Sequence, residues 1–214
     1  GPGSGAESPP PFKNEDLDMI REQIAGARAV AGQAQASAVA VRNAQNWSTS
    51  INGTTNDYLD AQSWVITAGR RFTAAEEQAG RSVCIIGNTI VSNLFQGVDP
   101  IGQRFRIGTV SCTVIGVLAT RGQGGFGNDQ DDVVIMTLKM VQRRFTGNRD
   151  LRSIMVAVDE AYDTKAVQKS LTGLLRERRN LTGSMPVNFN IFDTRQISDA
   201  VSSSTRVMTG LLGA

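Results

Sequence analysis

The chain of 214 residues contains no histidine, only two cysteines, and few aromatic side chains, which make up 6% of it. The absence of histidine excludes Ser-His and Cys-His nucleophile pairs and removes the commonest metal ligand and the usual general base near neutral pH. An enzyme built on this sequence would have to be a carboxylate-based hydrolase that uses Asp131 or Asp132. Because neither belongs to a recognisable paired site, we expect the chain to be non-catalytic.

The sequence also lacks an excess of one charge and a long apolar run. Its 22 Lys and Arg residues nearly balance 20 Asp and Glu residues, and a net charge of +2 does not indicate a nucleic-acid partner. No apolar stretch approaches the roughly 20 residues that span a bilayer, so we expect this chain by itself to be soluble. With 40% apolar residues, it is long enough for one large domain or two small ones.

The two ends of the chain are unlike those of an ordinary domain. Residues 1–4 resemble the remnant of a cleaved tag, and three consecutive prolines at 9–11 predict an extended leader. Apolar residues between 197 and 212 follow helical spacing and predict a terminal helix that grows more apolar toward its end. The residues alone leave two interpretations of this helix open, the approach to a membrane span and an ordinary amphipathic helix.

Hydrophobic periodicity and turn residues predict alternating helices and strands between these ends. Helix caps are predicted at Asn14, at Thr73 (a capping box with Glu76), at Asn88 or Thr89, and at Thr137. A further helix is predicted to begin at Asp163 or Thr164, with an apolar stripe of Val167, Leu171, Leu174 and Leu175. Strands are predicted over residues 28–41, 46–51, 82–86, 104–107, 110–118, 133–136, 154–158 and 189–192. Gly108 favours a hairpin between two of them, whereas Asn52-Gly53 allows either a turn or a continuing strand. The pattern indicates an α+β (mixed α/β) fold with a βαβ-like part near the C-terminus and a middle rich in strands.

A glycine-rich loop precedes the strand predicted at 133–136. Its candidate functional residues are Gly122, Gly124, Gly125, Gly127, Gln130, Asp131 and Asp132. The loop lacks the GKS or GKT ending of a phosphate-binding loop and leads into a strand rather than into a helix. Its carboxylates do not have calcium-loop spacing, so we expect no metal or other cofactor here. We predict a conformational loop in which Asn and Asp side chains form turns.

The cysteines and the larger aromatic side chains allow two interpretations each. Cys84 and Cys112 lie in apolar predicted strands, either as two small buried side chains or as a disulfide formed in an oxidising compartment. Trp47, Trp64 and Phe72 are candidates for contact with a partner. The alternative, that they are core aromatics under a loop, is favoured because aromatic side chains bury a large apolar area.

Eight short motifs follow one another in a fixed order along the chain. They are residues 52–58 (NGTTNDY), Trp64 with 69–72 (GRRF), 83–87 (VCIIG), 94–95 (LF), 99–102 (DPIG), 105–107 (FRI), 112–117 (CTVIGV) and 127–133 (GNDQDDV). Together they resemble the periplasmic core domain of MacB-type ABC transporter permeases, which is related to FtsX-like and LolC/LolE-like permeases. Residues 205–214 resemble the stretch where such proteins re-enter the membrane. Asn56 stands where the family usually has proline, and the two cysteines are also departures.

The resemblance implies a two-part domain on the periplasmic side of the bacterial inner membrane. Residues 1–13 would be tag and linker, 14–55 and 152–214 a porter-like part, and 56–151 an inserted sabre-like part. ATP and magnesium would belong only to a separate cytoplasmic domain of the parent transporter. The resemblance further implies a homodimer, membrane attachment through flanking helices, a periplasmic adaptor protein and an outer-membrane exit duct as partners.

The resemblance also implies a mechanical role without catalysis. Helices 14–25 and 196–214 would transmit a cytoplasmic ATPase cycle to an adaptor or an exported substrate. The loop at 122–132 would then be the candidate hinge at the junction of the two parts, since its glycines permit large dihedral changes. The competing hypothesis is a stand-alone extracytoplasmic protein that binds a peptide, lipid or small molecule in a pocket lined by Trp47, Trp64 and Phe72.

Overall fold

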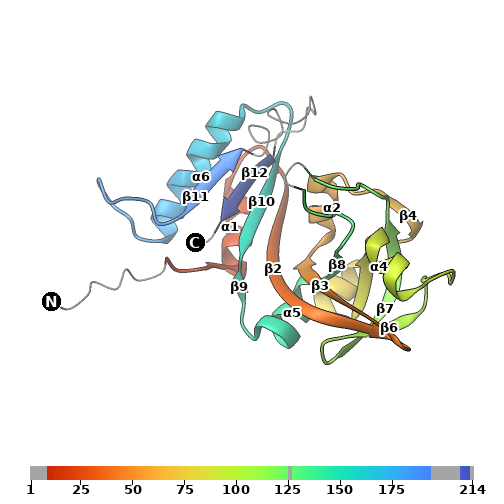
Figure 1. The fold of residues 1–214 in the computed structure, drawn as a ribbon. Coiled ribbons are helices and arrows are strands. Elements are labelled where there is room, and N and C mark those ends of the chain that lie inside the picture. The colour runs from red at the N-terminus through yellow and green to blue at the C-terminus, as the bar shows by residue number, and fades with distance from the viewer. Residues whose placement is uncertain (1–8, 125–126, 194–207, 213–214) are drawn as a thin grey trace. The chain divides into compact units, whose positions relative to one another are not determined.

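A computed structural model describes residues 9–124, 127–193 and 208–212, which form two compact units (Figure 1). The terminal unit combines Gly1–Val30 with Asp150–Ala214, and the middle unit is Ala31–Arg149. The mixed α/β fold expected from the sequence is confirmed. No helix in the described ranges is long and apolar enough to cross a membrane.

The N-terminal boundary between the units lies inside a strand, at Val30 rather than at the predicted residue 55. Strand β2 (Ala27–Arg42) pairs with β3 (Gln45–Thr54) from Ala34 to Arg42, and β3 pairs in turn with a strand of the middle unit. This pairing joins residues 31–54 to the middle unit. The porter-like and sabre-like assignment of the two units stays a prediction.

The terminal unit packs two helices with a small antiparallel sheet. Its elements are β1 (Phe12–Lys13), α1 (Asn14–Gln23), the start of β2, β9 (Asp150–Leu151), β10 (Ser153–Val158), α6 (Thr164–Arg178), β11 (Asn190–Asp193) and β12 (Met208–Leu212). Strand β12 lies between β10 and β11, and β1 pairs with β9. Helix α6 buries Val167, Leu171 and Leu175, the stripe that its period predicted.

Two sequence predictions for the terminal unit are wrong. Helix α1 begins at Asn14, but Lys13 is its cap, and the Lys13 backbone N–H donates to Asp16 Oδ2 at 2.8 Å. The predicted terminal helix is replaced at Met208–Leu212 by β12, while residues 194–207 lie outside the described residues. Thr209 and Gly210 are weak helix formers, and a strand between two neighbours satisfies their backbone groups on both sides.

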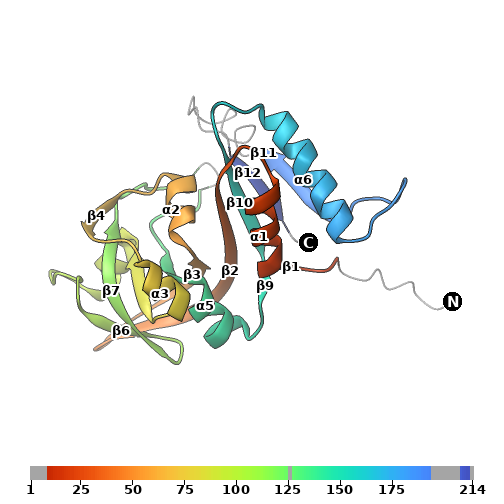
Figure 2. The ribbon, with the colours of Figure 1, turned by 180° about the vertical axis from the view of Figure 1, so that it is seen from behind.

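The middle unit is built on a sheet that closes on itself (Figure 2). Besides β2 and β3 it contains α2 (Asn56–Gln62), β4 (Ile66–Gly69), α3 (Ala74–Ala79), β5 (Val83–Ile86), α4 (Asn88–Leu94), β6 (Arg104–Ile107), β7 (Val110–Leu118), β8 (Val134–Thr137), α5 (Leu138–Val141) and the π-helical turn η1 (Gln142–Thr146). Hydrogen-bonded neighbours run β2-β3-β8-β5-β7-β6 and return to β2. Strand β4 is added on β7 outside this ring. Closure removes most of the unpaired strand edges.

Two positions in the middle unit require glycine, one for a close approach of two elements and one for a turn. Asn52-Gly53 does not form a turn, because β3 continues to Thr54. A Cβ on Gly53 would lie 2.4 Å from Val141 Cβ, so glycine lets α5 approach β3 closely. Gly108, with a φ of 58°, opens the turn of the predicted β6–β7 hairpin, which is confirmed.

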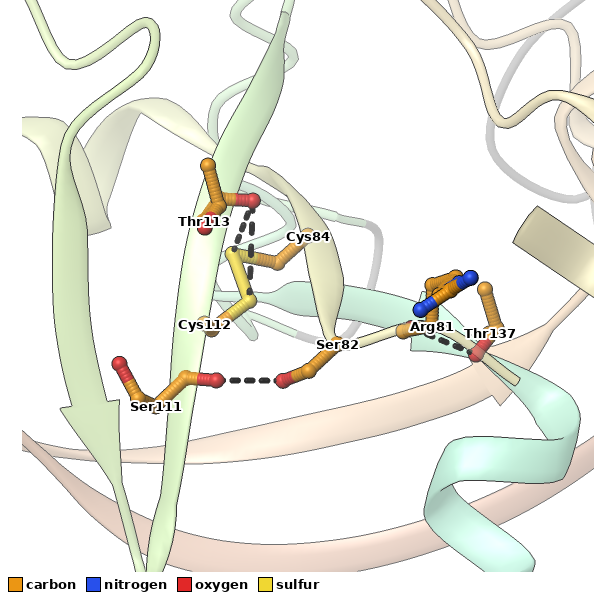
Figure 3. The surroundings of a disulfide bond; sticks show 7 residues. All are labelled: Arg81, Ser82, Cys84, Ser111, Cys112, Thr113 and Thr137. Atoms are coloured by element: carbon orange, nitrogen blue, oxygen red, sulfur yellow. Dashed lines mark hydrogen bonds between the residues drawn. A yellow bond between two sulfur atoms is a disulfide. The ribbon is translucent and has the colours of Figure 1, made fainter. Parts of the chain in front are cut away.

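Cys84 and Cys112, both fully buried, form a disulfide that joins β5 to β7 across a Cα–Cα distance of 6.1 Å (Figure 3). The structure therefore selects the disulfide from the two interpretations of the cysteines. The Thr113 carbonyl oxygen lies 3.6 Å from Cys84 Sγ. Since a disulfide sulfur carries no proton, this approach is a contact in the oxidised protein and becomes a hydrogen bond only for the free thiol. The Ser82 hydroxyl donates to the Ser111 carbonyl beside it.

Candidate functional site

The first residues of the glycine-rich loop are held by the carboxylate of Asp131. This side chain is only 5% exposed and accepts hydrogen bonds from the backbone N–H groups of Arg121 at 2.7 Å and Gly122 at 2.9 Å. The Gln130 N–H donates to the Gly122 carbonyl at 3.0 Å, so the two ends of the loop are fastened to each other. The buried Asp131 carboxylate thus satisfies two partly buried backbone donors, and a charged acceptor makes these bonds stronger than neutral ones.

Three glycines shape the backbone of the described part of the loop. Gly122 and Gly127 have φ values of 73° and 74°, the left-handed region that favours glycine. Gly124 accepts from Gly127 N–H and donates to the Asn128 carbonyl at 2.8 Å. Gly125 lies outside the described residues. These glycines and backbone bonds form the turns of the loop, and its role as a hinge stays a prediction.

Two further carboxylates fasten the end of the loop to neighbouring elements. Asp129 Oδ2 accepts from the Thr89 hydroxyl at 2.5 Å, at the start of α4. Asp132 Oδ1 accepts from Trp47 Nε1 at 3.0 Å and from the Thr49 hydroxyl at 2.6 Å, both on β3. The three carboxylates therefore reach different partners, and in the described part of the chain no group of three or more His, Cys, Asp or Glu side chains could hold a metal ion.

The three candidate partner-contact aromatics separate into different environments. Trp64 and Phe72 are 8% and 4% exposed and lie in the core cluster of the middle unit with Leu59, Ile85 and Ile135 among its members. Partner contact is therefore wrong for these two side chains, and their burial agrees with the favoured alternative of core aromatics. Trp47 is half-buried, and its indole N–H is already bonded to Asp132.

Arg121 is a residue of this site that sequence analysis missed. Its guanidinium carbon lies 3.7 Å from the centroid of the Trp64 ring, and it also donates to the Gln62 carbonyl. A cation over a tryptophan face is attracted by the ring quadrupole, so Arg121 covers the core where the loop begins. Burial raises the pKa of the nearby Tyr58 hydroxyl above its ordinary value, against hydrogen bonds from Trp64 and Asn52 that lower it. No motif in the sequence links these distant positions.

The departure at Asn56 has a structural explanation. The Asn56 backbone N–H donates to Glu77 Oε1 at 2.9 Å, a bond that proline could not make. Its side chain donates to the Phe72 carbonyl at 2.8 Å and accepts from the Phe72 N–H at 3.2 Å. Asn56 therefore ties the start of α2 to the segment before α3.

Glu76, at the start of α3, has its acidity changed by a neighbouring arginine. Hydrogen bonding to Arg70 lowers the pKa of this carboxyl from 4.5 to about 2, with a smaller contribution from the Thr73 backbone. The two guanidinium–carboxylate distances are 2.7 and 3.1 Å. Thr73 and Glu76 also form the predicted capping box, which is confirmed.

The chain matches a family of known proteins over most of its length. The family model described as MacB-like periplasmic core domain matches residues 1–174. This chain belongs to that family. The Macrolide export ATP-binding/permease protein MacB of Rhodospirillum rubrum is 36% identical over 194 residues, which cover 90% of this chain and 29% of that protein. The protein of the same name from Chlorobium luteolum is 32% identical over 213 residues, or 99% of this chain and 31% of the relative.

Solved structures show the same fold for this MacB-like domain. The periplasmic region of MacB from Actinobacillus actinomycetemcomitans has a TM-score of 0.77 at 19% identity, covering 94% of this chain and 87% of that one. The extracellular domain of the ABC-type transporter YknZ from Gram-positive bacteria has a TM-score of 0.69 at 23% identity, covering 82% and 87%. The chain spans less than a third of the length of these two curated relatives. Family membership makes it an extracytoplasmic domain of the type found in MacB-like ABC transporters.

Proposed function

We propose that this MacB-like domain transmits an ATP-driven conformational change of a parent exporter to a periplasmic adaptor protein or to the exported substrate. ATP and magnesium would act in a separate cytoplasmic domain, and the parent would be a homodimer in the inner membrane that leads to an outer-membrane exit duct. The names of the curated relatives, which combine an ATP-binding part with a permease, support this proposal.

The observation that carries the proposal is the division of the chain into two compact units. The chain passes between them only at Val30–Ala31 and at Arg149–Asp150. A transition between two arrangements needs rigid bodies and a few residues that absorb the dihedral change. The crossing at Arg149–Asp150 lies between η1 and β9 and meets that need, whereas the crossing at Val30–Ala31 lies inside β2 and would act as a bend in that strand.

These crossings are better supported as the hinge than the loop at 122–132. The loop belongs entirely to the middle unit, and the partners described above for Asp129, Asp131 and Asp132 belong to the same unit. Both ends of the loop are fastened by charged hydrogen bonds. We therefore assign the movement to residues 30–31 and 149–150, and give the loop the role of a fixed surface feature.

Spin-label distances in the reconstituted parent transporter test this movement. Labels at Lys165→Cys in the terminal unit and Val98→Cys in the middle unit, both exposed, report on the two units. We expect their distance distribution to shift when an ATP analogue or vanadate traps the transporter. A control pair inside the middle unit, Val98→Cys with Thr67→Cys, should not shift. Unchanged distances for both pairs would overturn the proposal.

The competing function, a stand-alone binding protein, is not favoured by the structure. It required a pocket lined by Trp47, Trp64 and Phe72. Two of these side chains are core residues, and the third is bonded to Asp132.

A further inference from the structure

The disulfide between Cys84 and Cys112 is enclosed by the strands of the ring (Figure 3). Cys84 lies opposite Val114 on β7 and Met136 on β8. Cys112 lies opposite Phe105 on β6. Both cysteines are fully buried, and none of these three neighbours is more than 3% exposed. In the folded unit, packed side chains therefore separate the two sulfurs from solvent.

A folded chain with reduced cysteines would not readily form this bond. A disulfide forms when a thiolate attacks a sulfur of an oxidant disulfide, which needs access for the oxidant and a negative charge on the attacking sulfur. The packed ring denies that access, and burial among apolar side chains disfavours the charge. The reduced Cys84 thiol would instead donate to the Thr113 carbonyl oxygen, which lies 3.6 Å from Cys84 Sγ. Folding before oxidation would thus leave the thiols unreactive.

The order of elements along the chain permits oxidation to come first. The two cysteines are separated by 28 residues, which include α4 and β6. Strand β8, which covers Cys84 with Met136, follows both cysteines in the chain. Since a chain that folds as it emerges presents its N-terminal part first, both thiols are available before β8 can complete the ring. This sequence holds only these two cysteines, so a single pairing is possible and an oxidant alone is sufficient.

We propose that Cys84 and Cys112 are the substrate site of a Cys-x-x-Cys oxidoreductase that acts on the chain before the ring closes. The Cys84 thiolate attacks the disulfide of the oxidant, which forms a mixed disulfide and releases one oxidant thiolate. The Cys112 thiolate then attacks Cys84 Sγ and releases the second oxidant thiolate. The chain thereby loses two electrons and two protons, and the oxidant becomes a dithiol.

The extracytoplasmic location of the domain supplies such an oxidant. Disulfides form and persist outside the cytoplasm, and a bacterial periplasm is kept oxidising by protein oxidants rather than by a small-molecule buffer. This step is independent of the movement proposed above, because it precedes the folded state in which the two units move.

Adding the oxidant at two different times tests the order of oxidation and folding. The reduced 214-residue chain, unfolded in urea, is diluted into buffer that already holds an oxidised Cys-x-x-Cys oxidoreductase. In the second arm the oxidant is added only after the fluorescence of Trp47 and Trp64 shows that the middle unit has refolded. Alkylation followed by mass measurement counts the remaining thiols. We expect oxidation to be at least about 100-fold slower in the second arm, because it then requires opening of the unit.

A parallel series with oxidised glutathione determines whether a small disulfide is excluded as well. Because the sulfurs are covered by packed side chains, we expect the same delay for glutathione as for the protein oxidant. Rapid oxidation of the refolded chain by either reagent overturns the inference.

Reduction of the folded protein provides a second test that does not require the reduced chain to fold. Dithiothreitol should reduce the disulfide at least about 100-fold more slowly in the folded protein than in urea, since exchange with an external thiol needs the same approach to the sulfurs. Equal rates of reduction would also overturn the inference. The matched control is Val98→Cys in the disulfide-bonded protein, because Val98 is 42% exposed in the same unit. Its thiol should react with oxidised glutathione at rates that differ by less than about threefold between the folded and unfolded protein. Neither result bears on the spin-label test of the proposed function.

Discussion

The two units of this domain are stabilised in different ways. The middle unit has a sheet closed into a ring, a buried disulfide between β5 and β7, and carboxylates bonded to buried backbone groups. In the terminal unit the corresponding links are side-chain contacts of two arginines at the end of α6, Arg178 with Asp16 at 3.0 Å and Arg179, the C-cap, over Phe12. A closed and cross-linked sheet opens only as a whole, whereas an open sheet with peripheral ion pairs opens piece by piece. The middle unit is thus suited to move as a rigid body, whereas local opening is expected in the terminal unit.

The largest expected effect comes from removing the disulfide. The double variant Cys84→Ala, Cys112→Ala should lower the free energy of unfolding of the middle unit by about 3–4 kcal/mol, because the bond closes a loop across a sequence separation of 28 residues. Both tryptophans of the chain, Trp47 and Trp64, lie in the middle unit, so their fluorescence in urea reports that unit alone.

The same experiment tests whether the two units unfold separately. Hydrogen exchange of α6 in the terminal unit should stay unchanged in the double variant. If exchange in α6 accelerates as much as exchange in β5, the two units unfold as one and the contrast between them fails. Treatment of the unsubstituted protein with a reducing agent should reproduce the loss of stability that tryptophan fluorescence reports for the middle unit.

A smaller effect is expected from Gly53→Ala. The added Cβ would lie 2.4 Å from Val141 Cβ, and overpacking of this kind costs about 1–3 kcal/mol because α5 must move away from β3. The matched control is Gly173→Ala on the exposed face of α6, where nothing lies within 4 Å and alanine favours the helix. We expect the urea midpoint of the tryptophan-fluorescence transition to fall only for Gly53→Ala. Hydrogen exchange in α6 should slow only for Gly173→Ala. A tolerated Gly53→Ala would show that α5 is not fixed on the ring.

Sequence patterns predicted the parts of this fold that local residues determine. The β6–β7 hairpin follows from Gly108 at its turn, and the capping box at Thr73 and the stripe of α6 follow from spacing within a few residues. Closure of the ring depends on pairing β2 with β6, for which the sequence holds no local signal. The prediction of a helix at 208–212 was wrong because the helical spacing there is local, whereas the two strand partners of this segment come from elsewhere in the chain.

The candidate site was also predicted only in part, because some of its contacts join segments that are distant along the chain. The glycine-rich loop was visible from composition, but the partners of its carboxylates were not, because Asp132 meets Trp47 only after β3 and β8 pair. For Trp64 and Phe72 the core interpretation was the favoured one, but partner contact stayed open because an aromatic side chain gives the same sequence signal in a core and at a surface. Arg121 was missed because its partner, Trp64, lies far away along the chain.

The smallest expected effect concerns acid stability of the middle unit. Because Arg70 lowers the pKa of the folded Glu76 carboxyl from 4.5 to about 2, the ionised carboxylate stabilises the folded state above pH 4.5, and that stabilisation is lost as the pH falls toward 2. The pair lies at the surface, so solvent screening limits its contribution to about 1 kcal/mol or less. Glu76→Gln keeps an acceptor for the Thr73 N–H and removes only the charge. The difference in tryptophan-monitored stability between the natural protein and Glu76→Gln should therefore be constant from pH 7 to 5 and shrink as the pH falls through 4.5 to below 2. A difference that persists at pH 2 would mean that capping, and not the charged pair with Arg70, accounts for the effect.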